Sequence, residues 1–170
     1  MRMLKSWGAV LALIALIVPH PAVTAPPRRQ DSEQDLLARM QRESDPIKKA
    51  KLEVRLARVK LLASMAALDQ GNMEETNRLL SAYLETLNGV WGRLKSSGRV
   101  ASKSSSGFKE LDIELREDAR YLEDLKHRIP YTDRGTAEKV AGRVDELRSE
   151  VLTALFPRRP LRKGGKANKP

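Results

Sequence analysis

The feature that most constrains the fold is a predicted helix whose apolar residues lie on two opposite faces. Asp45 and Pro46 are a helix cap followed by proline at the first helical position, so a helix is expected to start at Pro46, run to about Gln70 and stop at Gly71. At about 100° per residue, its apolar residues fall on two arcs. The arcs comprise Ile47, Ala50, Val54, Ala57, Leu61, Met65 and Leu68, and Leu52, Leu56, Val59, Ala63 and Ala66. A helix packed on both sides is expected at the centre of a helical fold.

Other segments of the chain also have apolar residues at helical spacing. They predict further helices over Ser32–Glu43 (capped by Asp31 or Ser32), from Asn72 to about Ser96, over Phe108–Ile129, and from after Thr132 or Asp133 to about Leu155. The last of these has a heptad seam typical of a coiled coil, and no segment alternates with the period of a strand. The predicted fold is therefore all-α: an antiparallel helical bundle of four long helices, arranged as two helical hairpins, plus a short N-terminal helix. The serine-rich stretch 96–107 is expected to be a loop, either a mobile crossover or an attachment site.

The two ends of the chain are predicted to lie outside this helical domain. Residues 1–25 have a basic start, a twelve-residue apolar run (Trp7–Val18) and small residues at Val23 and Ala25, which is typical of a secretory signal peptide. The run spans about 18 Å as a helix, short of the roughly 30 Å of a bilayer core. The expected organisation is signal peptide 1–25, linker 26–31, helical bundle domain 32–156 and disordered basic tail 157–170. We expect an exported, periplasmic protein; Pro26 is unfavourable next to the cleavage site, so an uncleaved signal attached to the inner membrane is the alternative.

Two groups of basic residues are candidates for binding anions. The chain has 32 Lys and Arg against 22 Asp and Glu, and much of the excess lies in the tail. The tail contributes Arg158, Arg159, Arg162, Lys163, Lys166 and Lys169, and a strip on the central helix contributes Lys48, Lys51, Arg55 and Arg58. An unstructured cationic tail binds polyanions through counterion release, although it can also serve solubility alone. For the strip, we favour internal pairing with the acidic residues of the 108–129 helix, which would select the helix register.

The sequence offers little for catalysis, metals or cofactors. There is no cysteine, and of the two histidines His20 belongs to the predicted signal peptide, which leaves His127 alone. The acids between Glu110 and Asp118 are expected on the polar side of their helix, where solvated carboxylates keep ordinary pKa values. We therefore predict a protein that is not an enzyme, with no metal, cofactor or small-molecule substrate. The aromatic residues at helical spacing are expected in the core; they are Tyr83, Trp91, Phe108 and Phe156.

Three short motifs resemble those of uncharacterised exported helical proteins of bacteria that contain a domain of unknown function. They are Asp45-Pro46-Ile47-Lys48-Lys49-Ala50-Lys51, the Gly71-Asn72 turn with Leu79-Leu80-Ser81-Ala82-Tyr83-Leu84, and Gly107-Phe108-Lys109-Glu110-Leu111. The resemblance implies export and a helical body, and it implies no activity. The architecture is also similar to that of exported helical chaperones and metal-stress proteins of the bacterial envelope, but the Leu-Thr-x-x-Gln signature of that family does not occur here.

Three functions follow from these features as hypotheses. The first is a noncatalytic interaction or structural module of the cell envelope, acting through a protein partner or self-association. The second is a binder of anionic envelope polymers or lipids through the basic tail, with nucleic acid a less available partner outside the cytoplasm. The third is a periplasmic holdase-type chaperone. The sequence names neither the partner nor the oligomeric state.

Overall fold

The computed structural model describes residues 32–157, and within this range the chain is all-helical. It has five α-helices and a 3-10 turn η1 (Tyr131–Asp133); the α-helices are α1 (Glu33–Arg42), α2 (Pro46–Asp69), α3 (Met73–Ser96), α4 (Phe108–Arg128) and α5 (Gly135–Leu155). The predicted signal peptide, the linker and the tail beyond Pro157 lie outside the described residues. Among the residues that are described, no helix is both long and apolar enough to cross a membrane.

The starts predicted from local sequence for α1, α2 and α3 are confirmed. Ser32 caps α1 by accepting a hydrogen bond from the Asp35 backbone N–H (3.1 Å). Asp45 caps α2 by accepting from the N–H groups of Ile47 (2.7 Å) and Lys48 (3.2 Å). The turn between α2 and α3 uses Gly71 at φ +72° and Asn72, whose side chain accepts from the Glu75 N–H.

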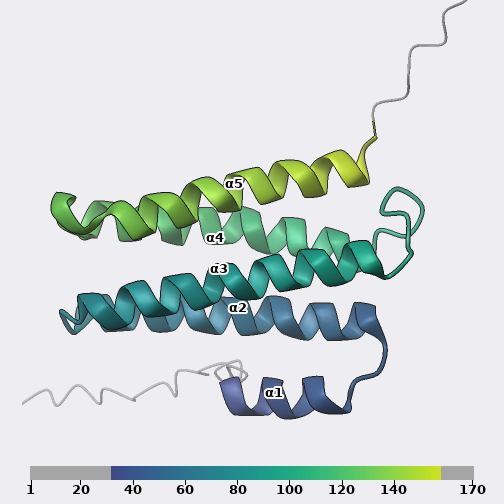
Figure 1. Cartoon of the computed structure of the whole chain (residues 1–170), viewed down its shortest axis with the longest axis horizontal. Coiled ribbons are helices and arrows are strands. Elements are labelled where there is room, and N and C mark those ends of the chain that lie inside the picture. The colour runs from purple at the N-terminus through teal and green to yellow at the C-terminus, as the bar shows by residue number, and fades with distance from the viewer. Residues whose placement is uncertain (1–31, 158–170) are drawn as a thin grey trace, which may run out of the picture. The chain divides into compact units, whose positions relative to one another are not determined.

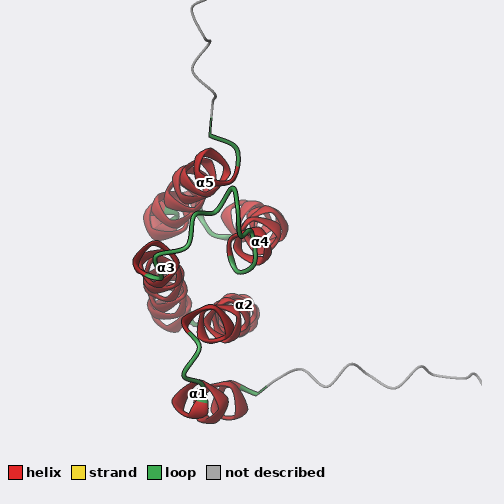
Figure 2. Ribbon diagram, turned by 90° about the vertical axis from the view of Figure 1, so that its right-hand side faces the viewer, coloured by secondary structure: helices red, strands yellow, loops and turns green. Residues whose placement is uncertain are grey.

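The helices pack in pairs that are also neighbours in the sequence. Helices α2 and α3 make the most extensive contact, α4 packs against α5, and further contacts join α3 to α5 and α2 to α4 (Figures 1 and 2). The buried apolar faces of these four helices form one bundle-like core. At one end of it, the Trp91 and Phe108 rings meet edge to face, with their centroids 6.1 Å apart.

Helix α2 is packed on two sides, as its two apolar arcs predict, but the second side is only partly covered. The first arc lies in the main core, with Met65 and Leu68 half-buried at its far end. The second arc packs against α1 in a separate cluster formed by Leu36, Leu52 and Leu56, with Met40 and Val59 against it. Because α1 is only ten residues long, it does not extend along the whole arc: Ala63 is half-buried and Ala66 is exposed.

Three sequence expectations need correction. Phe156 is 72% exposed rather than part of the core, because it follows the last residue of α5. Helix α5 begins at Gly135, one or two residues later than expected, because Tyr131–Asp133 form a separate 3-10 turn. The loop after α3 is anchored to the protein body, since Ala101 is 5% exposed and belongs to the main core.

Candidate functional site

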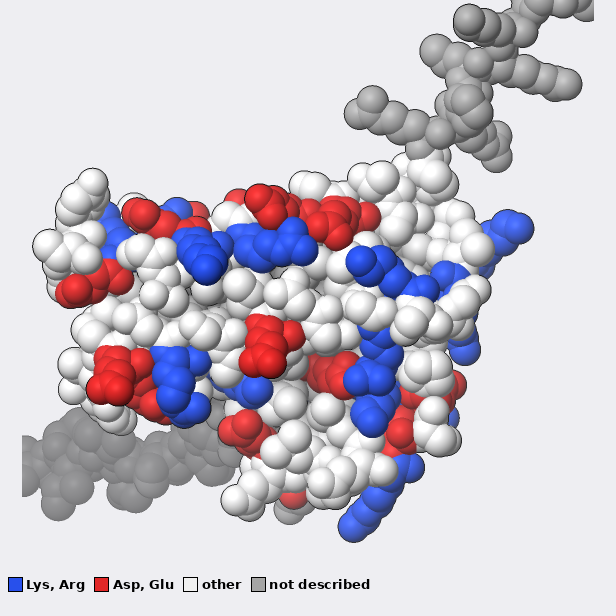
Figure 3. Space-filling view, in the orientation of Figure 1, with Lys and Arg blue, Asp and Glu red and all other residues white. Residues whose placement is uncertain are grey.

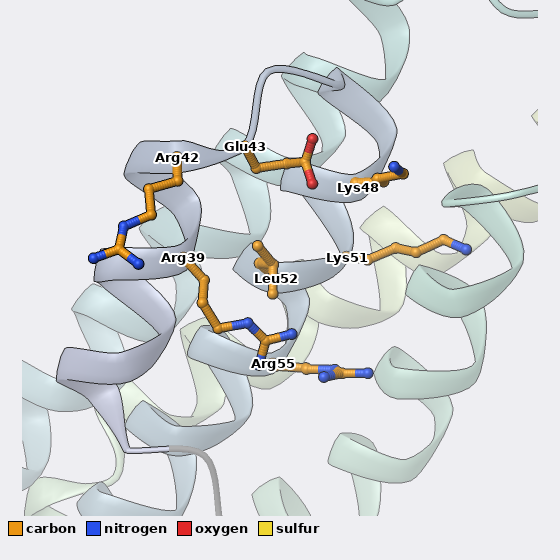
Figure 4. A pocket seen from close by; sticks show the side chains of 7 residues that line it. All are labelled: Arg39, Arg42, Glu43, Lys48, Lys51, Leu52 and Arg55. Atoms are coloured by element: carbon orange, nitrogen blue, oxygen red, sulfur yellow. The ribbon is translucent and has the colours of Figure 1, made fainter.

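A groove between α1 and α2 is lined mainly by basic side chains. It has a volume of about 390 Å³ and is open to solvent. Its lining consists of Arg39, Arg42, Glu43, Lys48, Lys51, Leu52 and Arg55. We call it the basic groove. In Figure 4, Leu52 lies between the two helices, the Arg39 side chain extends from α1 toward Arg55 of α2, and Arg42 turns to the outer side of α1.

The strip predicted on α2 divides between this groove and the contact with α4. Lys48 is exposed and lies at the groove together with Lys51 and Arg55. Lys51 also pairs with Glu110 of α4, with Nζ and Oε1 2.5 Å apart. Arg58 does not line the groove and pairs with three carboxylates of α4. The α4 carboxylates therefore neutralise the charge of Arg58 and part of the charge of Lys51, as internal pairing predicts.

A second feature is a cluster of charged and polar side chains buried between α2, α3 and α4. The Arg58 guanidinium donates to Asp118 and to Glu114 (3.2 Å), and it lies 4.4 Å from the centroid of the Tyr121 ring. The Tyr83 hydroxyl donates to the other oxygen of Asp118 (3.0 Å). The Asp118 side chain is fully buried, and that of Glu114 is 19% exposed. We call Arg58, Tyr83, Glu114 and Asp118 the charge cluster.

Burial shifts the pKa values in the charge cluster. Burial, reinforced by the charge of Asp118, raises the pKa of Glu114 to about 7. Burial also raises the pKa of Asp118, but both of its oxygens accept hydrogen bonds, from Arg58 and Tyr83, and these favour its charged form. Burial together with the neighbouring Asp118 raises the pKa of the Tyr83 hydroxyl, which therefore stays protonated and donates. The expectation that the α4 acids are solvated with ordinary pKa values is wrong for Glu114 and Asp118.

The burial of Asp118 was missed because Asp118 was expected on the polar side of its helix with the other acids. Ala119 is half-buried, while Asp118 is enclosed. The spacing of the apolar residues indicates this burial. Leu111, Leu115 and Leu122 follow the alternating three- and four-residue steps of a buried seam, and position 118 is the seam position between Leu115 and Leu122. The contribution of α1 to the basic groove was also missed. Arg39 and Arg42 are one turn apart on a helix that a three-residue connection folds back against α2.

The remaining candidate residues lie apart from these two features. Trp91 is buried, and its indole Nε1 donates to Glu150 of α5 (2.7 Å), while Phe108 is in the core. His127 is exposed near the end of α4, and within residues 32–157 no group of His, Asp or Glu side chains is arranged to hold a metal ion. The tail cations from Arg158 onward lie beyond the described residues.

Much of the remaining described surface mixes the two signs of charge. Figure 3 shows acidic and basic side chains interspersed on one face. Several of these charges form ion pairs, such as Arg143 with Glu146 and Arg93 with Glu53. The basic groove has a less even mixture of charge, since five cations and one carboxylate line it. Comparison with the models of known protein families, with curated proteins and with solved structures finds no match to this chain.

Proposed function

We propose that the protein is an exported, noncatalytic interaction module that binds an anionic polymer of the cell envelope through the basic groove. The observation that carries the proposal is the lining of the groove, where cations from two helices outnumber a single carboxylate, Glu43. Phosphate-bearing polymers suit such a lining because Arg and Lys side chains bind phosphate oxygens with charge-assisted hydrogen bonds. The export step rests on the sequence of residues 1–25 alone.

The geometry of the groove favours an extended ligand over a compact one. Lys48, Lys51 and Arg55 lie within an eight-residue stretch of α2, whose seven steps correspond to about 10 Å along the helix axis. Arg39 and Arg42 add cations from the neighbouring helix. The side chains extend in different directions rather than toward one point (Figure 4), so a ligand with several spaced negative charges meets more of them than a single ion does. The tail provides six further cations for the same chemistry.

The direct test measures binding of fluorescent linear polyphosphate over a range of salt concentrations. Wild-type protein is expected to bind with an affinity that falls steeply with salt, at roughly 0.7 logarithmic units per phosphate contact for each tenfold rise in salt. The double substitution Arg42→Glu with Lys48→Glu is expected to weaken binding tenfold or more at low salt. Arg116→Glu with Lys139→Glu changes the net charge equally at exposed positions outside the groove, and is the matched control.

A truncation separates the groove from the tail. Deleting residues 157–170 is expected to lower the affinity for polyphosphate. In the truncated protein, the groove variant is still expected to bind more weakly than its matched control. If the groove variant binds like the control and the truncation alone abolishes binding, the groove is not the site. Vesicles with phosphatidylglycerol, compared with neutral vesicles, show whether a lipid surface replaces the soluble polymer as the ligand.

We further propose that α2–α5 form one antiparallel four-helix bundle of two helical hairpins, with α1 as an added short helix. The four helix contacts, α2 with α3, α3 with α5, α5 with α4 and α4 with α2, support a closed ring. In solution, nuclear Overhauser effects are expected from the Trp91 ring to Phe108 of α4 and to Glu150 of α5. Their absence from an otherwise assigned spectrum would contradict this arrangement.

A further inference from the structure

The carboxyl groups around the half-buried Arg58 outnumber the cations that act on them. Arg58 is the cation that α2 places within ion-pair distance of Glu114, Glu117 and Asp118, all from α4. From α3, the cluster receives the neutral Tyr83 hydroxyl, and the positive charge of Arg55 on α2 also acts on Glu114. On α5, Arg148 pairs with Asp112 of α4 (3.2 Å). When all three carboxylates are ionised, they outnumber the two guanidinium groups, Arg58 and Arg55, that act on them, so the negative charge is in surplus.

The surplus lies at the contact between α2 and α4. Arg58 is the link, because its guanidinium reaches across from α2 to Glu114 and Asp118 and also covers the Tyr121 ring of α4. Asp118 accepts hydrogen bonds from two donors, Arg58 and Tyr83, whereas Glu114 accepts one hydrogen bond, from Arg58. Of the two carboxyl groups in the charge cluster, Glu114 is thus the one whose protonation relieves the repulsion at the smaller loss of hydrogen bonding.

We propose that the charge cluster is a proton-operated latch on the contact between α2 and α4. The two helices are held together most firmly when Glu114 carries a proton, and the contact opens more readily when Glu114 is ionised. Charge repulsion and burial of an ion both act against the closed arrangement in the ionised state. Because the periplasm takes the pH of the surrounding medium, an exported protein with such a latch would respond to external acidity.

The direction of the pH dependence follows from the raised pKa of Glu114. A carboxyl group with a pKa of about 7 in the closed state and an ordinary value when open binds its proton more tightly in the closed state. The stabilisation by the proton is complete at low pH and is lost as the pH rises through about 7. Between pH 6 and pH 8, the equilibrium constant for opening is expected to rise about tenfold.

Hydrogen exchange of the α4 backbone amides tests the latch. After correction for intrinsic exchange rates, the opening constants of wild-type amides near Glu114 are expected to rise about tenfold from pH 6 to pH 8. The Glu114→Gln variant keeps a neutral side chain of the same shape, and its opening constants are expected to stay flat. Glu123→Gln removes an exposed carboxylate from the same helix, and this control is expected to retain the wild-type pH dependence.

A second measurement does not depend on how the variants fold. The side-chain carboxyl carbon of Glu114 in the wild-type protein, followed by NMR, is expected to titrate near neutral pH and to shift together with signals of Asp118. A titration midpoint near the ordinary glutamate value would overturn the proposal. It would equally be overturned if the opening constants of wild-type α4 did not change with pH, or if Glu114→Gln kept the tenfold change.

Discussion

Replacing Gly107 with alanine tests how closely the loop before α4 packs on the core. Gly107 is the N-cap of α4 and has φ +88°, a conformation that L side chains rarely adopt. A Cβ atom at this position would lie 2.7 Å from Leu94 Cδ2 and 3.2 Å from Ile47 Cγ2. Both neighbours are buried in the main core, so they have little room to move aside. The Gly107→Ala variant is therefore penalised both by its backbone conformation and by a steric clash.

The magnitude of each penalty can be isolated with two other glycines. The left-handed conformation costs an alanine about 1–2 kcal/mol, and overpacking a core costs about 1–3 kcal/mol, so Gly107→Ala is expected to destabilise by about 2–5 kcal/mol. Gly71 also has a positive φ but open space around it, so Gly71→Ala is expected to destabilise only through the left-handed backbone conformation. Gly92 lies within α3 with open space, and Gly92→Ala is expected to stabilise by about 1 kcal/mol.

The assay is equilibrium unfolding in urea, followed by far-ultraviolet circular dichroism and supported by thermal scans. The free energy of unfolding is expected to decrease in the order Gly92→Ala, wild type, Gly71→Ala and Gly107→Ala. If Gly107→Ala unfolds within about 0.5 kcal/mol of Gly71→Ala, the close approach to Leu94 and Ile47 is not present in solution. If Gly92→Ala is also destabilising, helix propensity does not govern that position.

Three further predictions follow from burial and hydrogen bonding. Tyr83→Phe removes a donor from the fully buried Asp118 and is expected to cost about 1–3 kcal/mol in urea unfolding, with no loss of helical dichroism at low denaturant. Leu36→Ala is expected to increase limited proteolysis within α1 while leaving the exchange protection of α3 unchanged, because Leu36 lies in the cluster separate from the main core. Phe108→Ala is expected to cost about 3–5 kcal/mol, whereas Phe156→Ala is expected to change stability by less than about 0.5 kcal/mol, and equal costs would contradict their different burial.

The helix boundaries are the part of the fold that local sequence predicts well. Asp45 before Pro46 starts α2, and Gly71 with Asn72 ends it and starts α3, because caps and left-handed turns depend on residues close together in the chain. The all-helical class follows from the same periodicity. Phe156 shows the limit of that reasoning, since an aromatic residue one position past a helix end has no neighbouring turn to bury it.

The two candidate sites depend on contacts between helices, which sequence spacing predicts less completely. Opposite charges on α2 and α4 indicated pairing, and Arg58 and Lys51 do pair with α4. The burial of Asp118 was not predicted, because a carboxylate in an apolar seam is favourable only when partners from two other helices are present. Arg58 and Tyr83 supply those partners from distant positions in the chain. The basic groove likewise requires that α1 fold back on α2.

The buried methyl group of Ala101 has a consequence for how copies of this chain can associate. Ala101 lies in the segment that connects α2 and α3 to α4 and α5, and it belongs to the main core. Two molecules that exchanged their α4–α5 halves would have to straighten this connection and withdraw Ala101 from its place. In domain swapping, two protomers exchange an identical element, and the hinge segment between the elements extends. Exchange of the α4–α5 halves would lose this contact, so the anchored connection favours assembly through intact surfaces over helix exchange.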